Sequence, residues 1–136
     1  GNPVVAISPD SKALYHAAAV MVSNQIVALA DMGTALLVKC GFSEAAAAEA
    51  LSPLLLGNAQ SVAEKGAVNA LTGPIERGDA QTVSKHLQEI RKFAAESTVG
   101  QDILTAYTAL SKQLIRIAQQ KHPQKDYKHL EKELEQ

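Results

Sequence analysis

One stretch of this chain, Asp10 to Gly41, constrains the fold more than any other because it reads as a single long apolar helix. Asp10 or Ser11 can cap its first turn by accepting backbone N–H bonds, and Gly41 is a residue type that commonly ends a helix. Small and aliphatic residues occupy nearly every side of its first half, which is typical of a helix buried among other helices. The sequence therefore predicts an all-α fold, a helical bundle around this one long central helix. The side chains expected to be buried are Leu14, Ala18, Val22 and Leu29.

The polar residues of this predicted helix gather on one side. Ser23, Asn24, Asp31 and Thr34 fall within about 80° of His16 when each residue turns the helix by about 100°. Two interpretations of this polar seam follow. In the first, the seam faces water or is satisfied within the bundle. In the second, its N-terminal half, from His16 to Asn24, lines a cleft.

Capping residues and apolar periodicity predict further helices. Ser43 caps a helix that Pro53 either kinks or ends by opening a new helix, and the helical pattern continues from there and stops at Gly66. Asp79 caps a helix over residues 80–96. Another apolar helical pattern extends over residues 101–121. The inward positions of the helix that begins after Asp79 recur at helical spacing, and they are Val83, Leu87, Ile90, Phe93 and Ala94.

The two ends of the chain differ from its helical middle. Residues 2–8, with the sequence NPVVAIS, favour a short strand that has no sheet to join. Residues 1–9 are therefore interpreted as the remnant of a strand that leads from another domain. Residues 123–136 are highly charged and predict a frayed or loosely docked terminal helix. The helical domain itself is expected to extend over residues 10–122.

Composition narrows the range of partners and compartments. The net charge is −1 and no stretch combines dense Lys and Arg with aromatic residues, which argues against nucleic acid as a partner. Polar residues interrupt the best apolar run before it reaches about 18 residues, so no membrane span is expected. The single Cys40 is consistent with a reducing cytoplasm. The four His residues lack the spacing of metal ligands, so no metal site is expected.

The most irregular stretch, residues 72–79, has the sequence TGPIERGD. Two glycines and a proline make it a defined turn rather than a flexible linker. Arg77 is its one charge suited to bidentate contact with a phosphate or carboxylate. The alternative is that Arg77 pairs with a neighbouring acid, while Asp79 caps the next helix.

Three blocks of sequence together resemble one bacterial family. They are YHAAAVMVSN at residues 15–24, LSPLLLGNAQSVAEKG at residues 51–66 and ALTGPIERGDAQTVSKHL at residues 70–87. The family is the helical C-terminal domain that follows a Rossmann-like NAD(P)-binding domain. It is similar to the C-terminal domains of 6-phosphogluconate dehydrogenase, ketopantoate reductase and pyrroline-5-carboxylate reductase. The resemblance covers about residues 3–121.

The resemblance implies a substrate-binding and dimerisation domain of an NAD(P)-dependent oxidoreductase. It implies a homodimer whose helical domains pack together. A small-molecule substrate would bind in a cleft between the helical domain and the Rossmann domain, which would bind NAD or NADP. No strand followed by GxGxxG and a helix occurs in these 136 residues, so the Rossmann domain is expected to be absent from this chain. Alone, the chain is not expected to catalyse hydride transfer.

The resemblance also assigns roles to individual residues. The first long helix of the wider class offers a Lys and one or two Asn to the substrate; here His16 stands at the expected Lys position and Asn24 lies two turns on. His16 would be a general acid toward a carbonyl or imine that receives hydride, since histidine changes charge near neutral pH. Asn24 would orient the substrate. A structural His16 with satisfied hydrogen bonds is the alternative. The further substrate-binding residues expected are Ser23, Thr72, Gly73 and Arg77.

These assignments predict that His16, Asn24 and Arg77 converge, either within one subunit or across a dimer. The competing interpretation comes from another class of protein. In it, the chain is a non-catalytic helical binding or scaffolding module whose polar seam recognises a partner.

Overall fold

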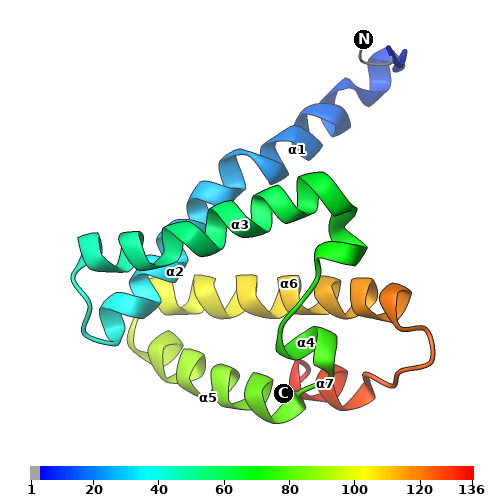
Figure 1. Cartoon of the computed structure of the whole chain (residues 1–136). Helices are drawn as coiled ribbons and strands as arrows, with labels where there is room; N and C mark the ends of the chain where they lie inside the picture. The colour runs from blue at the N-terminus through cyan, green and yellow to red at the C-terminus, as the bar shows by residue number, and fades with distance from the viewer. Residues whose placement is uncertain (1–3) are drawn as a thin grey trace. The chain divides into compact units, whose positions relative to one another are not determined.

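The computed structural model describes residues 4–136, and these residues form helices and no strand (Figure 1). The predicted all-α fold with five or more helices is therefore confirmed. The elements are the 3-10 helix η1 (Pro9–Ser11) and the α-helices α1 (Lys12–Val22), α2 (Asn24–Lys39), α3 (Glu44–Ala70), α4 (Pro74–Arg77), α5 (Ala80–Glu96), α6 (Thr98–Lys121) and α7 (Lys128–Glu133).

The chain divides into two compact units, Gly1–Pro53 and Leu54–Gln136. The first unit contains η1, α1, α2 and the start of α3. The second contains the rest of α3 and the helices α4 to α7. Each unit is described by itself below.

The first unit does not contain the single long helix that the sequence predicts. The helix is interrupted at Ser23, whose φ of −115° and ψ of −75° separate α1 from α2. The Ser23 hydroxyl donates a 2.7 Å hydrogen bond to the Ala19 carbonyl, one turn earlier. A serine that bonds to the preceding turn in this way often bends a helix. The expected cap is also wrong, because the Ser11 side chain makes no capping bond to α1.

The burial expected for this helix is wrong as well. Leu14 and Val22 expose 76% and 73% of their surface, and Ala18 and Leu29 are also exposed. Within the described part of the first unit, residues 4–53, Ala47 is the only buried residue. Apolar periodicity identifies a face that needs a partner, but a face is buried only where another element covers it. The first unit therefore presents apolar helices without a core of its own.

Helix α3 contacts α2 in the first unit at Gly33. A side chain carbon at Gly33 would lie 3.1 Å from the Cδ1 atom of Leu51, a tighter contact than such atoms normally make. Because Gly33 has no side chain, α2 leaves room there for the Leu51 side chain of α3. Helix α3 is capped as predicted, because the Ala46 amide donates to the Ser43 hydroxyl at 3.3 Å.

The N-terminal segment forms no strand in its described part. Residues 4–8 have no regular secondary structure, whereas residues 1–3, which include the start of the predicted strand, lie outside the described residues. The interpretation of this segment as the remnant of another domain stays a prediction. The same holds for the predicted domain boundaries after residues 9 and 122.

One run near the N-terminus, Pro9–Lys39, is long and apolar enough to cross a membrane by length and composition. The sequence predicts no membrane span here, because Ser23, Asn24 and Asp31 interrupt the run. An apolar helix that packs against protein meets the same criterion, so hydropathy alone does not distinguish lipid from protein as its neighbour.

The second unit is built on an antiparallel hairpin of α5 and α6 (Figure 1). The hairpin turns at Ser97, whose hydroxyl accepts a 3.0 Å hydrogen bond from the Gly100 amide and caps α6. This cap starts α6 at Thr98, three residues before the predicted start. The predicted inward residues of α5 are confirmed except for Phe93, which is half-buried. Helix α3 is broken at Gly66, as predicted, by a φ of 74°.

The core of the second unit also includes the C-terminal helix. Tyr127, Leu130 and Leu134 are buried, and they pack with Leu87 and Ile115. The prediction of a frayed or loosely docked terminal helix is therefore wrong. Residues 127, 130 and 134 recur at helical spacing, so even a short charged helix presents one complete apolar face. The core cluster consists of Leu71, Ile75, Val83, Leu87, Ile115, Ala118, Tyr127, Leu130 and Leu134.

Candidate functional site

The N-terminal half of the polar seam lies on the first unit and is exposed to solvent. His16 lies on α1 and Asn24 begins α2, so the break at Ser23 separates them. The Ser23 hydroxyl donates to both the Ala19 carbonyl at 2.7 Å and the Asn24 side chain oxygen at 3.0 Å. The side chain oxygen of Asn24 therefore already accepts one hydrogen bond, which comes from the neighbouring Ser23 hydroxyl. The seam is accessible to a ligand but is not enclosed by the first unit.

Thr72, Gly73 and Arg77 lie in the second unit on a turn around the short helix α4. Gly73 has a φ of 98° and Gly78 a φ of 73°, which L side chains rarely adopt. The Arg77 amide donates to the Gly73 carbonyl at 3.1 Å. The side chain of Ile75 is buried and anchors the turn in the core. The glycines therefore shape this segment as a defined turn, as the sequence predicts.

The two acids that flank Arg77 both bond to other groups. Asp79 accepts 3.0 Å and 2.7 Å hydrogen bonds from the Thr82 amide and hydroxyl, which together lower the pKa of its carboxyl. Glu76 makes its ion pair with other cations. Within residues 4–136, no ion pair shorter than 4.0 Å includes Arg77, whose side chain is exposed. The alternative in which Arg77 pairs closely with a neighbouring acid is therefore wrong, although the Asp79 charge still acts on it at longer range.

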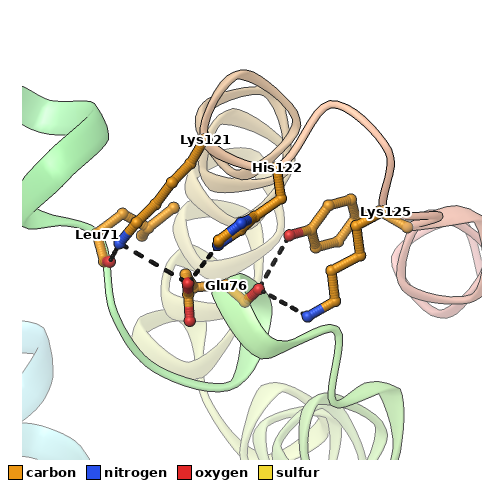
Figure 2. Close-up of polar contacts among 6 residues, drawn as sticks. Leu71, Glu76, Lys121, His122 and Lys125 are labelled. Atoms are coloured by element: carbon orange, nitrogen blue, oxygen red, sulfur yellow. Dashed lines mark hydrogen bonds and ion pairs between the residues drawn. The ribbon is translucent and has the colours of Figure 1, made fainter.

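Glu76 is the centre of a polar cluster that connects the turn to the end of α6 (Figure 2). His122 Nε2 donates a 2.6 Å hydrogen bond to Glu76 Oε1, and Lys121 Nζ lies 3.7 Å from the same oxygen. The hydrogen bond from His122 lowers the pKa of the Glu76 carboxyl. Desolvation opposes this effect, while the charges of Lys121, His122 and Lys125 act in the same direction as the hydrogen bond. Glu76 is therefore held as a carboxylate by cations of a distant segment.

Two backbone carbonyls, one just before the turn and one within it, accept hydrogen bonds from the same distant segment. Lys121 Nζ donates a 2.7 Å hydrogen bond to the Leu71 carbonyl, before the turn. The Tyr127 hydroxyl and Lys125 Nζ donate to the Glu76 carbonyl at 2.9 Å and 3.3 Å. The sequence alone does not predict these contacts. Basic residues near the end of a helix are a known signal for bonds to carbonyls, but that signal does not identify partners about 50 residues away.

The structure places the predicted site residues in two groups on two units. His16, Ser23 and Asn24 belong to the first unit, and Thr72, Gly73 and Arg77 belong to the second. The convergence of His16, Asn24 and Arg77 stays a prediction. Over residues 4–136, no group of three or more His, Cys, Asp or Glu side chains is arranged to hold a metal ion.

Comparison with known proteins gives one match. Residues 1–114 match the model of a family that is described as a domain of unknown function, DUF2520. No curated protein and no solved structure matches the chain. The family match covers the polar seam and the turn, and it ends before the segment that bonds to Glu76.

Proposed function

This chain belongs to the DUF2520 family of domains of unknown function, and we propose that it binds the substrate of an NAD(P)-dependent oxidoreductase and dimerises. NAD or NADP would be bound by a Rossmann domain that these residues do not contain. The proposed location is the cytoplasm. The proposal is supported by the three sequence blocks that resemble the helical domains of such reductases. It is also supported by the geometry of the turn that carries Arg77.

One observation carries the proposal that the turn binds a small anionic molecule. Arg77 is exposed on a turn whose own acids are bonded to Thr82 and His122. An arginine without a close carboxylate partner can make two parallel hydrogen bonds to a substrate carboxylate or phosphate. Thr72, also exposed, and the Gly73 backbone lie on the same turn and would contribute further polar contacts. The substrate class proposed for this site is a small carboxylate or phosphate that also carries a carbonyl or imine.

In the proposed mechanism, His16 is the general acid. Hydride from the nicotinamide would reach the substrate carbon, and His16 would donate a proton to the carbonyl oxygen or imine nitrogen. Asn24 and Ser23 would orient the reacting group by hydrogen bonding. This assignment requires that His16 and Arg77 come within roughly 15 Å of each other in one subunit or across a dimer, so that one small molecule contacts both.

The proposed dimer is supported by the exposed apolar helices of the first unit. Residues 4–53 bury one side chain, that of Ala47, while Leu14, Met21 and Val22 are largely exposed. Large exposed apolar surfaces commonly mark protein–protein contacts. A second copy of the chain offers the same apolar helices, and a two-fold axis would bury both sets at once.

The experiment that tests this function uses the full-length gene product that contains these residues. It is incubated with NADH or NADPH and with a panel of carboxylate and phosphate compounds that carry a carbonyl or imine. Consumption of the reduced cofactor is followed by its absorbance. We expect at least one compound to be reduced. Absence of turnover with every compound and both cofactors would contradict the proposal.

Two substitutions then test the assigned residues. Arg77→Gln is expected to raise the KM by about 10- to 100-fold, because a charge-assisted hydrogen bond contributes about 1.5–3 kcal/mol. His16→Gln is expected to lower kcat by about 10²- to 10⁴-fold. The matched controls are Arg116→Gln on α6 and His129→Gln on α7, both at exposed positions. The assignments fail if each variant behaves like its control.

A non-catalytic binding module is the second candidate, and one observation favours it. The hydroxyls of Ser23 and Thr34 already donate to the carbonyls of Ala19 and Ala30, so part of the polar seam is satisfied by its own helices. The coding sequence upstream of Gly1 distinguishes the two functions. A strand followed by GxGxxG would support the oxidoreductase, and its absence would support the binding module.

A further inference from the structure

The turn that carries Arg77 is bonded to one segment, residues 121–127, at Leu71 just before it and at Glu76 within it. Before the turn, Lys121 Nζ donates to the Leu71 carbonyl at 2.7 Å. Within the turn, His122 Nε2 donates to the Glu76 carboxylate at 2.6 Å, and the Tyr127 hydroxyl donates to the Glu76 carbonyl at 2.9 Å. Figure 2 shows Lys121 and Lys125 directed at the backbone oxygens of Leu71 and Glu76, and His122 directed at the Glu76 carboxylate.

The turn has little intrinsic capacity to hold this conformation. Helix α4 contains four residues, and a single helical turn is not stable in isolation. Its backbone bonds are few, among them those from the Gly78 amide to the Ile75 carbonyl and from the Asp79 amide to the Pro74 carbonyl. External contacts must therefore supply much of its order. The buried side chain of Ile75, the packing of α4 against α5 and α6, and the bonds from residues 121–127 supply such contacts.

The ring of Tyr127 is buried in the core, and its hydroxyl bonds to the turn. Tyr127 is 2% exposed and packs in the core, which fixes the position from which its hydroxyl donates to the Glu76 carbonyl. Without the Tyr127 hydroxyl, the Glu76 carbonyl keeps only the longer 3.3 Å hydrogen bond from Lys125 Nζ. His122 has a different effect, because it bonds to the carboxylate of Glu76, the residue that precedes Arg77 in the sequence. The segment therefore fixes the backbone of the turn and also keeps Glu76 away from Arg77.

We propose that Lys121, His122 and Tyr127 are positioning residues that hold the turn of residues 72–79 in the form that presents Arg77 to an anionic ligand. This inference rests on the proposed function for the ligand, but the positioning itself does not. These residues follow the part of the chain that matches the family, residues 1–114. The proposed positioning therefore uses residues outside the part of this chain that matches the family.

Amide hydrogen exchange of the 136-residue chain tests the positioning directly. Tyr127→Phe keeps the ring in the core and removes only the hydroxyl. We expect the amides of Arg77, Gly78 and Asp79 to exchange about three- to tenfold faster, which corresponds to the loss of one hydrogen bond. Amides in the middle of α5 and α6 should keep their wild-type rates. The matched control is Tyr107→Phe, which removes the hydroxyl that bonds to His86 in the same unit.

Two outcomes would overturn the proposal. In one, the turn of the Tyr127→Phe variant exchanges at the wild-type rate. In the other, exchange rises equally in the turn and in α5 and α6, which would indicate a general role in core stability. If the Tyr127 variant does not fold, His122→Gln is measured against His129→Gln with the same criteria. Faster exchange confined to the turn in the His122 variant supports the proposal, and wild-type exchange overturns it.

A ligand titration separates this proposal from the proposed function. Inorganic phosphate and malonate are titrated into the chain while the backbone amide resonances of residues 72–79 are followed by NMR. Arg77→Gln tests the anion site, and Tyr127→Phe tests its positioning. We expect binding to be lost in the first variant and weakened about three- to tenfold in the second. If the Arg77 variant loses binding and the Tyr127 variant binds like the wild type, the positioning is overturned and the anion site stands.

If the wild type binds neither phosphate nor malonate, the proposed anion site at Arg77 is rejected. The exchange experiment then still decides whether the segment positions the turn.

Discussion

Gly100, in the first turn of α6, lies directly against the backbone of Phe93 near the end of α5. A Cβ atom at Gly100 would overlap the Phe93 carbonyl and approach the Ala94 amide nitrogen to 2.7 Å. The obstacle is backbone, which cannot rotate away as a side chain tip can. The tight connection between α5 and α6, which supports the core of the second unit, therefore depends on a glycine at this position.

Gly100→Ala is expected to destabilise the second unit by about 1–3 kcal/mol, because overpacking against a backbone outweighs the helix propensity that alanine adds. Urea unfolding followed by circular dichroism measures this change. The matched control is Gly57→Ala in α3, where an added Cβ has no neighbour within 4 Å. The control should be stabilised by about 0.5–1 kcal/mol. Equal stability of the two variants would contradict the predicted collision.

Truncation of Leu130 tests whether the C-terminal helix belongs to the core. Leu130 is 1% exposed and packs in the core cluster, so Leu130→Ala should lower the free energy of unfolding by about 2–5 kcal/mol. Leu110→Ala, at an exposed position of α6, should lower it by less than about 1 kcal/mol. Urea unfolding compares the two variants. A cost at Leu130 as small as that at Leu110 would show that α7 is loosely docked.

The Glu76 carboxylate makes the stability of the second unit depend on pH in the acid range. Its pKa is lowered from the ordinary value of 4.5, chiefly by the His122 hydrogen bond. A carboxyl with a lowered pKa stabilises the fold while it is ionised. Its contribution is complete above pH 4.5 and is lost as the pH falls through the lower pKa of the folded state. The urea midpoint should therefore fall on acidification below this value.

Glu76→Gln should make the acid dependence of the urea midpoint less steep, because the variant cannot lose a carboxylate there. The midpoint is measured at intervals from about pH 6 to about pH 3. Glu89→Gln is the control, since Glu89 pairs with Lys92 at an exposed surface position. The control should keep the wild-type dependence on pH. The predicted role of Glu76 is rejected if both variants follow the wild type.

Local sequence signals predicted helix α5 of the second unit well. Asp79 caps α5 as expected, and the periodic residues Val83, Leu87 and Ile90 are buried. These signals act within a few residues of each other, so their structural effect depends little on the rest of the chain. The location of the turn at residues 72–79 was predicted for the same reason, because Gly73 and Gly78 allow its positive φ angles, but the contacts that hold it in place were not predicted.

Features that depend on distant contacts were not predicted. Glu76 and His122 are 46 residues apart, and no local pattern identifies them as partners. The burial of Leu14 and Val22 was predicted from periodicity, but burial also requires a second surface, and the described chain does not provide one there. The break at Ser23 was missed because a serine in a helix either points to solvent or bonds to the preceding turn, and the sequence does not decide between them.

The exposed side chains of α1 give the last prediction, which concerns the proposed homodimer. We expect the 136-residue chain to sediment as a dimer at micromolar concentration, with the apolar helices of the first unit in the interface. Burial of a leucine side chain contributes about 1.5–3 kcal/mol, and a two-fold interface contains each residue twice. Leu14→Asp should therefore weaken the dimer by at least about 100-fold, since about 3 kcal/mol or more is lost.

The control for this variant is Leu110→Asp, which places the same charge at an exposed leucine of α6 in the second unit. It should leave the dimer intact, because the proposed interface lies on the first unit. Sedimentation equilibrium of the three proteins at several concentrations gives the dissociation constants. A monomeric wild type would contradict the dimer itself. A dimer that Leu110→Asp disrupts and Leu14→Asp does not would place the interface on the second unit instead of the exposed helix α1.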